Sequence, residues 1–97
     1  MNNQQEKTLL PGSLRLQLKK QAHHLKPVIQ IGKKGISDAL LKEIDGALLA
    51  HELIKIQLPK EYRALEEDLP RILQETRSHH IDTIGNVVIL YRKIETT

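Results

Sequence analysis

Two glycines and two lysines form a short motif, Gly32-Lys33-Lys34-Gly35, between a β-branched run and an amphipathic run. Glycine reaches backbone angles that other residues resist, so the chain can turn sharply and come close to a ligand here. Ser37 follows as a typical helix N-cap, and a helix start presents unpaired N–H groups with a partial positive charge. Together these features predict a cradle for the phosphate groups of a polyanion.

The motif alone leaves a structural alternative open, because many strand-to-helix turns hold two glycines for geometry and solvated lysines. The charge distribution favours the functional interpretation. Residues 1–35 carry seven basic side chains against one acidic, whereas residues 36–97 carry eight basic against eleven acidic. This concentration of positive charge indicates a surface for a polyanion, with a solvated basic helix as the alternative.

Length and composition restrict the class of protein. Ninety-seven residues, 39% of them hydrophobic and 28% charged, fit one small soluble domain. No apolar run approaches the roughly 20 residues needed to cross a bilayer, and the first residues lack the pattern of a signal peptide. The chain has no cysteine, which excludes disulfides and thiolate metal sites. We therefore expect a cytoplasmic protein.

The remaining polar residues do not form a catalytic or metal-binding pattern. Adjacent histidines, as at positions 23 and 24, point about 100° apart on a helix and are not arranged to chelate a metal. No serine lies in a G-x-S-x-G motif, and Gly35 is followed by Ile36 rather than by the Gly-Lys-Ser/Thr of a P-loop. We expect no enzyme activity, no metal and no cofactor.

Hydrophobic spacing predicts three helices and four strands. They are a helix from an N-cap at Ser13 to Leu25, a strand at 28–31, a helix at 38–51, a strand at 53–58, a helix at 63–77, and a hairpin of 81–84 with 87–92. Pro70 removes a hydrogen bond inside the third helix, so we expect one kinked helix. Strands separated by helices imply parallel units with right-handed crossovers. The predicted fold is α/β: a four-stranded mixed sheet with three helices in the order α-β-α-β-α-β-β.

The side chains of these elements divide into buried and exposed sets. In the first helix the residues at 14, 18, 22 and 25 predict the buried face, which leaves Arg15, Lys19 and Lys20 on the remaining surface. The last strand is nearly all apolar, so we expect it inside the sheet, next to its hairpin partner.

Three blocks of the sequence resemble the CRM domain family and together cover about residues 13–92. They are Leu-Lys-Pro-Val-Ile-Gln-Ile-Gly-Lys-Lys-Gly-Ile-Ser at 25–37, His-Glu-Leu-Ile-Lys-Ile at 51–56 and Ile-Gly-Asn-Val-Val-Ile-Leu-Tyr-Arg at 84–92. The chain resembles the bacterial single-domain, YhbY-type members in particular. The resemblance implies a fold similar to the C-terminal domain of the third bacterial translation initiation factor. It also implies an RNA-binding module that acts in maturation of the large ribosomal subunit.

The resemblance assigns RNA-binding roles to particular residues. It places the RNA-contacting loop at Gly32, Lys33, Lys34 and Gly35, with Lys19, Lys20 and Lys26 extending the surface and Lys55, Arg92 and Lys93 as secondary candidates. The chain has no Phe or Trp and two Tyr, so we expect recognition of RNA shape and phosphate positions rather than aromatic stacking. The expected partner is ribosomal RNA in pre-50S particles, and neither DNA nor a membrane is expected.

The resemblance also divides the chain into a flexible tail at 1–12, a CRM RNA-binding domain at 13–92 and a tail at 93–97. Two alternatives for the function remain open. One is an adaptor that docks on a ribosomal protein or assembly factor through the acidic second half, including Glu66 and Glu67. The other is a regulator that binds other structured RNA. The exposed acids of the third helix make that helix a poor surface for RNA.

Overall fold

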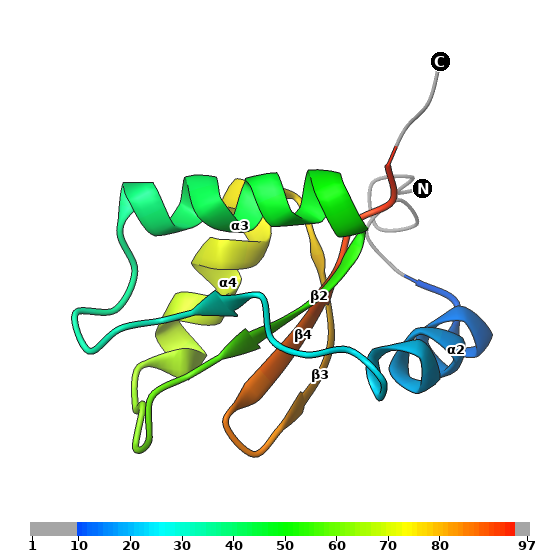
Figure 1. Cartoon of the computed structure of the whole chain (residues 1–97), viewed down its shortest axis with the longest axis horizontal. Coiled ribbons are helices and arrows are strands. Elements are labelled where there is room, and N and C mark those ends of the chain that lie inside the picture. Colours follow the sequence, from blue (N-terminus) through cyan, green and yellow to red (C-terminus); the bar gives the residue numbers. More distant parts are fainter. Residues whose placement is uncertain (1–9, 95–97) are drawn as a thin grey trace, which may run out of the picture.

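The computed structural model describes residues 10–94, which form three helices and four strands (Figure 1). In chain order they are α2 (Gly12–Ala22), β1 (Ile29–Gln30), α3 (Asp38–His51), β2 (Leu53–Gln57), α4 (Leu65–Thr76), β3 (His79–Ile84) and β4 (Val87–Tyr91). The predicted order of elements is therefore confirmed. No helix in the described range is long and apolar enough to span a bilayer.

The four strands form one mixed sheet in the order β1-β2-β4-β3. The β1 strand pairs with β2 in parallel, and β4 pairs antiparallel with both β2 and β3. The apolar β4 thus lies inside the sheet, as predicted. Two further backbone hydrogen bonds, from Val28 to Lys55 and from Ile31 to Gln57, extend the β1 ladder to the predicted residues 28–31.

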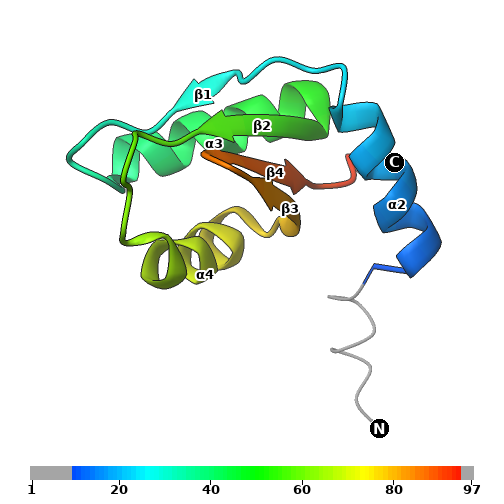
Figure 2. The ribbon, with the colours of Figure 1, turned by 90° about the horizontal axis from the view of Figure 1, so that it is seen from below.

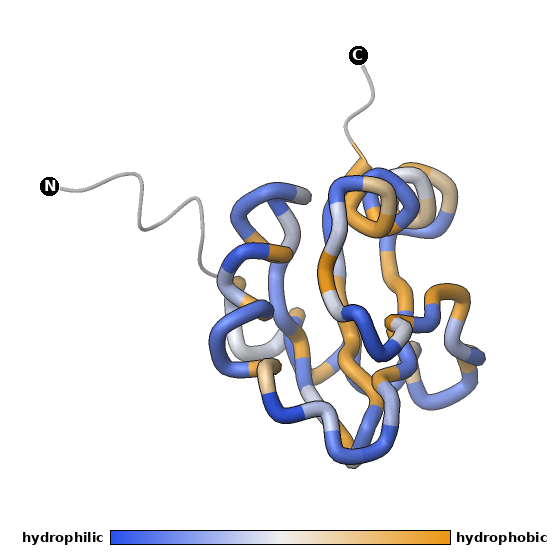
Figure 3. The backbone as a smooth tube through the Cα atoms, turned by 90° about the vertical axis from the view of Figure 1, so that its left-hand side faces the viewer, coloured by the Kyte–Doolittle hydropathy of each residue, from blue (hydrophilic) through white to orange (hydrophobic). Residues whose placement is uncertain are grey.

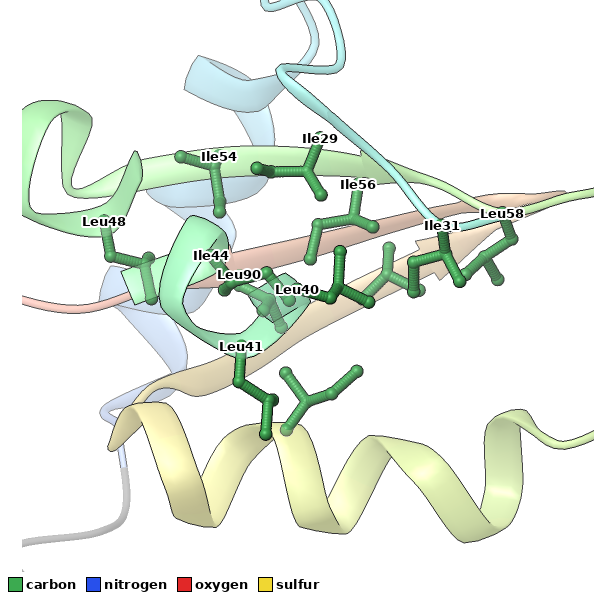
Figure 4. Close-up of a cluster of buried hydrophobic side chains, with 12 residues drawn as sticks. Ile29, Ile31, Leu40, Leu41, Ile44, Leu48, Ile54, Ile56, Leu58 and Leu90 are labelled. Atoms are coloured by element: carbon green, nitrogen blue, oxygen red, sulfur yellow. The ribbon is translucent and has the colours of Figure 1, made fainter. Parts of the chain in front are cut away.

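One face of the sheet is covered by α3 and α4 and holds the larger core (Figure 4). Ile44 and Leu48 of α3 are completely buried against Ile54, Ile56 and Leu90 of the strands. Full burial of each such side chain contributes about 1.5–3 kcal/mol. The buried residues of α3, which are Leu40, Leu41, Ile44 and Leu48, follow helical spacing, and this helix therefore fixes where the turn before it can lie.

The other face of the sheet is covered by α2 at one end only (Figure 2). Leu18 and Ala22 pack there against Leu53, Ile81 and Ile89 in a second, smaller cluster. The strand alternation that buries one set of residues under α3 turns the other set toward α2. Among the described residues, no helix lies over the part of this second face beyond α2 (Figure 2).

The first helix differs from its prediction at both ends. It starts at Gly12 with Pro11 as N-cap, so the predicted cap Ser13 lies inside the helix and no side chain caps the start. It ends at Ala22, and the Leu25 N–H bonds the Ala22 carbonyl in a turn that carries the chain toward β1. Leu25 is consequently 38% exposed rather than buried. Residues 1–9 and 95–97 of the predicted tails lie outside the described residues.

Arg15 also differs from its prediction, because it is not a free surface residue. Its guanidinium donates hydrogen bonds to the backbone carbonyls of His80 and Ile81 on β3. These contacts tie α2 to the edge strand of the sheet, which the helical pattern of α2 alone could not reveal.

The α4 helix runs from Leu65 to Thr76 with Pro70 inside it, so the prediction that one helix continues through Pro70 is confirmed. Proline deprives the carbonyl four residues earlier, at Glu66, of its helical donor. Both Glu66 and Pro70 are exposed, so water can satisfy that carbonyl. Ile72 and Thr76 of α4 are buried, and Leu65, Leu69 and Leu73 pack against the main core.

Candidate nucleic-acid interface

The Gly32–Gly35 segment is a tight turn, closed by a hydrogen bond of 3.0 Å from the Gly35 N–H to the Gly32 carbonyl. Gly35 has φ +82, a conformation that favours glycine. Gly32 has no positive φ and a Cβ there would meet nothing within 4 Å, so only one of the two predicted glycines is required by the backbone. The side chains of Lys33 and Lys34, at the tip of the turn, are exposed.

The α3 helix begins directly after this turn, and its N-cap is confirmed. Ser37 has extended backbone angles, and its Oγ accepts a hydrogen bond of 3.1 Å from the Leu40 N–H. The N–H groups of Asp38 and Ala39 lie in the first turn, where an α-helix supplies no internal acceptor. These N–H donors and the positive end of the helix dipole lie next to the lysine turn. A helix N-terminus with free N–H donors is the kind of site that binds anions.

Tyr62, in the loop between β2 and α4, lies beside the turn. A Cβ added at Gly35 would lie 3.7 Å from the Tyr62 hydroxyl, so the two residues are neighbours. That hydroxyl donates a hydrogen bond to the Asp68 carboxylate, and the ring packs on the main core. Burial, followed by the hydrogen bond and charge of Asp68, raises the pKa of Tyr62 to about 12. The pattern of neighbouring residues could not reveal this proximity, because Gly35 and Tyr62 lie in distant segments of the chain.

The basic side chains predicted to form one surface lie at different places in the molecule. The β1–α3 turn lies at one end and α2 at the other end in both ribbon views (Figures 1 and 2). The longest dimension of the molecule is 39 Å. The exposed Lys20 and the Lys19 side chain therefore lie far from the turn, and Lys26 lies on the segment that connects the two ends.

The secondary candidates differ in how free their side chains are. Arg92 donates to the Asp45 carboxylate at 2.6 Å and to the Thr76 carbonyl at 2.7 Å, so its guanidinium serves the packing of α3, α4 and β4. Lys55 donates through Nζ to the Leu25 carbonyl at 3.0 Å. Lys93 is exposed after the end of β4, at the end away from the turn. The Arg92 guanidinium is therefore occupied by contacts within the protein, and Lys55 and Lys93 remain as the secondary candidates for RNA contact.

The start of α4 lies at the same end of the molecule as the turn but has the opposite charge (Figures 1 and 2). Glu66 and Glu67 are exposed in its first turn, and Asp68 accepts the Tyr62 hydrogen bond. In the view onto this end, the nearest segments are mostly hydrophilic (Figure 3). The lysine turn and the acidic first turn of α4 thus give this end two electrostatically different sides.

Comparison with known proteins agrees with the fold. The CRS1 / YhbY (CRM) domain model matches residues 10–92. The Bacillus subtilis protein named Probable RNA-binding protein YqeI is 37% identical over 88% of this chain and 90% of its own length. A Haemophilus influenzae protein named RNA-binding protein is 39% identical over 80% of each chain.

A solved structure shares the architecture. The solution structure of the hypothetical protein SAV1595 from Staphylococcus aureus matches with a TM-score of 0.74 and 34% identity, covering 91% of this chain and 93% of that one. The matched family model covers nearly all of the described residues, both core clusters and the Gly32–Gly35 turn. The chain therefore belongs to the CRS1 / YhbY (CRM) domain family.

Proposed function

We propose that this protein is a non-catalytic RNA-binding protein that holds the RNA backbone at the Gly32–Gly35 turn. The observation that carries the proposal is the hydrogen-bonded turn, with two exposed lysines at its tip, directly before the capped start of α3. Backbone N–H groups there would bind phosphate oxygens. Lys33 and Lys34 would neutralise phosphate charge and release counterions. A glycine-bracketed loop that clamps backbone nucleotides is a known mode of RNA recognition.

We propose ribosomal RNA in large-subunit precursors, in the cytoplasm, as the target. The resemblance to single-domain bacterial members and the RNA-binding names of two relatives support RNA as the ligand class. The RNA-binding domain would comprise residues 13–92. Lys26 and the α2 lysines Lys19 and Lys20 would extend the interface along the molecule, and Lys55 and Lys93 would contribute less.

The Lys33→Ala, Lys34→Ala double variant tests the turn. Loss of two phosphate contacts reduces the salt slope of RNA binding by roughly 1.4 to 1.8. The matched control is Lys42→Glu, which changes the formal charge equally at an exposed position of α3. Binding is measured by fluorescence anisotropy over a salt series, after circular dichroism has established that each variant folds. Equal slopes for the double variant and the wild type would remove the turn from the mechanism.

The same variants test the target in a cell lysate. We expect the tagged wild-type protein to sediment with large-subunit precursors in a density gradient. Nuclease treatment or the double variant should release it to the top, whereas Lys42→Glu should remain with the particles. A wild-type protein found only at the top, under conditions that preserve the particles, would exclude this target and leave the adaptor or another structured RNA.

A further inference from the structure

The part of the sheet that no described helix covers lies between the Gly32–Gly35 turn and α2 (Figure 2). Cross-strand pairing places one residue from each strand in a row across the sheet. Side chains alternate between the two faces of a strand, so this row lies on the same face of the sheet as α2 but beyond the end of that helix. We call this row the open sheet row; its members are Gln30, Gln57, Val87 and Ile84. In Figure 2 the strands stand in front of α3, with α2 at one end only.

The open sheet row combines amide groups with exposed apolar surface. Gln30 is exposed, Ile84 is 62% exposed, and Gln57 and Val87 are half-buried. The Gln57 side-chain amide already donates to the backbone carbonyls of Leu58 and Asn86. The row therefore offers apolar contact at Ile84 and hydrogen-bonding groups at the Gln30 amide and the Gln57 side-chain oxygen. No member of the row is charged.

The next positions on this face add little negative charge. Lys55 lies two residues before Gln57 on β2, and it pairs across the sheet with Ile89, which pairs in turn with Asp82. The Asp82 carboxylate is 3.5 Å from the Lys19 ammonium of α2. The negative charge of Asp82 is therefore compensated, and this face presents neutral and basic side chains to a polyanion.

The open sheet row is continuous with the proposed phosphate site. Gln30 is the last residue of β1, and the chain passes through Ile31 directly into Gly32. At the other end of this face stands α2, which carries Lys19 and Lys20. An RNA strand held at the turn and at α2 would therefore cross the uncovered sheet between them.

We propose that the open sheet row is a second part of the RNA interface and contacts the bases of unpaired nucleotides. This inference rests on the proposed RNA-binding function. A duplex stacks its base faces and pairs their Watson–Crick edges, so it presents no apolar base surface to the exposed isoleucine. Unpaired bases expose apolar faces and hydrogen-bonding edges, which match the isoleucine and the glutamine amides. Recognition then extends beyond the phosphate positions expected from the turn alone.

The test uses two uncharged double variants matched in residue type. Gln30→Ala with Ile84→Ala alters the open sheet row. Gln74→Ala with Leu49→Ala alters an exposed glutamine of α4 and a leucine of α3 that is 59% exposed. The probes are an unstructured single-stranded RNA of about 12 nucleotides, within the site sizes of single-strand binders, and a blunt-ended RNA duplex that consists of a paired stem alone.

We expect the row variant to bind the single-stranded probe about tenfold more weakly than the control variant, a loss of ~1.4 kcal/mol. The salt slope should stay unchanged because no charge is removed, and binding of the paired stem should be equal for both variants. Equal single-strand affinities for the two variants would overturn the inference. So would an equal loss on both probes. If Gln30→Ala with Ile84→Ala does not fold, Gln30→Ala alone is compared with Gln74→Ala.

Failure of the proposed function has a different signature. A wild-type protein that binds neither probe, at any salt concentration, would refute RNA binding itself. Wild-type binding that depends on Lys33 and Lys34 but not on the open sheet row would refute only the second contact surface.

Discussion

Two helices start at the same end of this molecule, and their first turns are built differently (Figures 1 and 2). The α3 helix follows a turn with two exposed lysines, is capped by Ser37 and has one acid, Asp38, in its first turn. The α4 helix has no side-chain cap and has three acids in its first turn. Both starts have the positive end of a helix dipole. The carboxylates of α4 supply the anions that its own start favours, whereas the α3 start favours an anion from outside.

The difference shows how a small domain can direct a polyanion to one side. Phosphate groups are repelled by Glu66 and Glu67 and attracted by Lys33 and Lys34. Tyr62 lies between the lysine turn and the start of α4, since it lies beside Gly35 and donates a hydrogen bond to Asp68. An RNA strand bound at the turn would therefore leave it toward β1 and the open sheet row, away from α4.

The largest expected effect concerns the backbone of the α3 start. A Cβ at Gly35 meets only an ordinary contact, but the left-handed backbone costs a non-glycine residue about 1–2 kcal/mol. We expect Gly35→Ala to lower the free energy of unfolding by that amount. Gly32→Ala is the matched control and should stay within about 0.5 kcal/mol of the wild type. Urea unfolding followed by circular dichroism measures both, and equal losses would contradict the assignment of strain to Gly35.

A smaller effect is expected at the α4 start. Each acid near a helix N-terminus contributes about 0.3–1 kcal/mol, so Glu66→Lys with Glu67→Lys should lower stability by about 1 kcal/mol. The control, Glu43→Lys with Glu75→Lys, makes the same charge change on exposed residues outside that turn. RNA affinity of the first variant should be no weaker than that of the control. Loss of large-subunit association with RNA affinity retained would instead favour the adaptor.

Sequence predicted the parts of this molecule that depend on neighbouring residues. The Ser37 cap acts on Leu40 only three positions away, and the inward stripe of α3 follows from helical spacing. The apolar composition of β4 placed it inside the sheet because an edge strand would expose it. The turn before α3 was likewise predicted, although its backbone requires only one of the two glycines.

Sequence did not predict the features that depend on contacts between distant segments. Arg15 lies on the polar side of the α2 pattern, yet it bonds β3 carbonyls more than sixty residues away. Lys20 and Lys33 are close in sequence, but the extended segment along the β1 edge separates α2 from the turn. Helical spacing also extended the first helix to Leu25, because it carries no information about where the chain must meet the sheet.

The smallest expected effect at neutral pH concerns the tyrosine that joins the two helix starts. The pKa of Tyr62 is raised to about 12 by burial and then by Asp68, from an ordinary value of 10.0. Below pH 10 the hydroxyl is protonated in both the folded and the unfolded chain. Between pH 10 and about 12 the unfolded chain releases this proton while the folded chain keeps it. The stabilisation that depends on the protonated hydroxyl is therefore lost as pH rises through this window.

Tyr62→Phe keeps the ring on the core and removes the group that titrates. We expect the variant to lose stability less steeply than the wild type between pH 10 and 12 in urea unfolding series. Tyrosinate absorbance should lose its component near pH 12 and keep that of Tyr91, whose pKa is raised by burial and by Glu52. A wild-type tyrosine that titrates at its ordinary pKa and disappears in this variant would show that Asp68 and Tyr62 do not link the two starts.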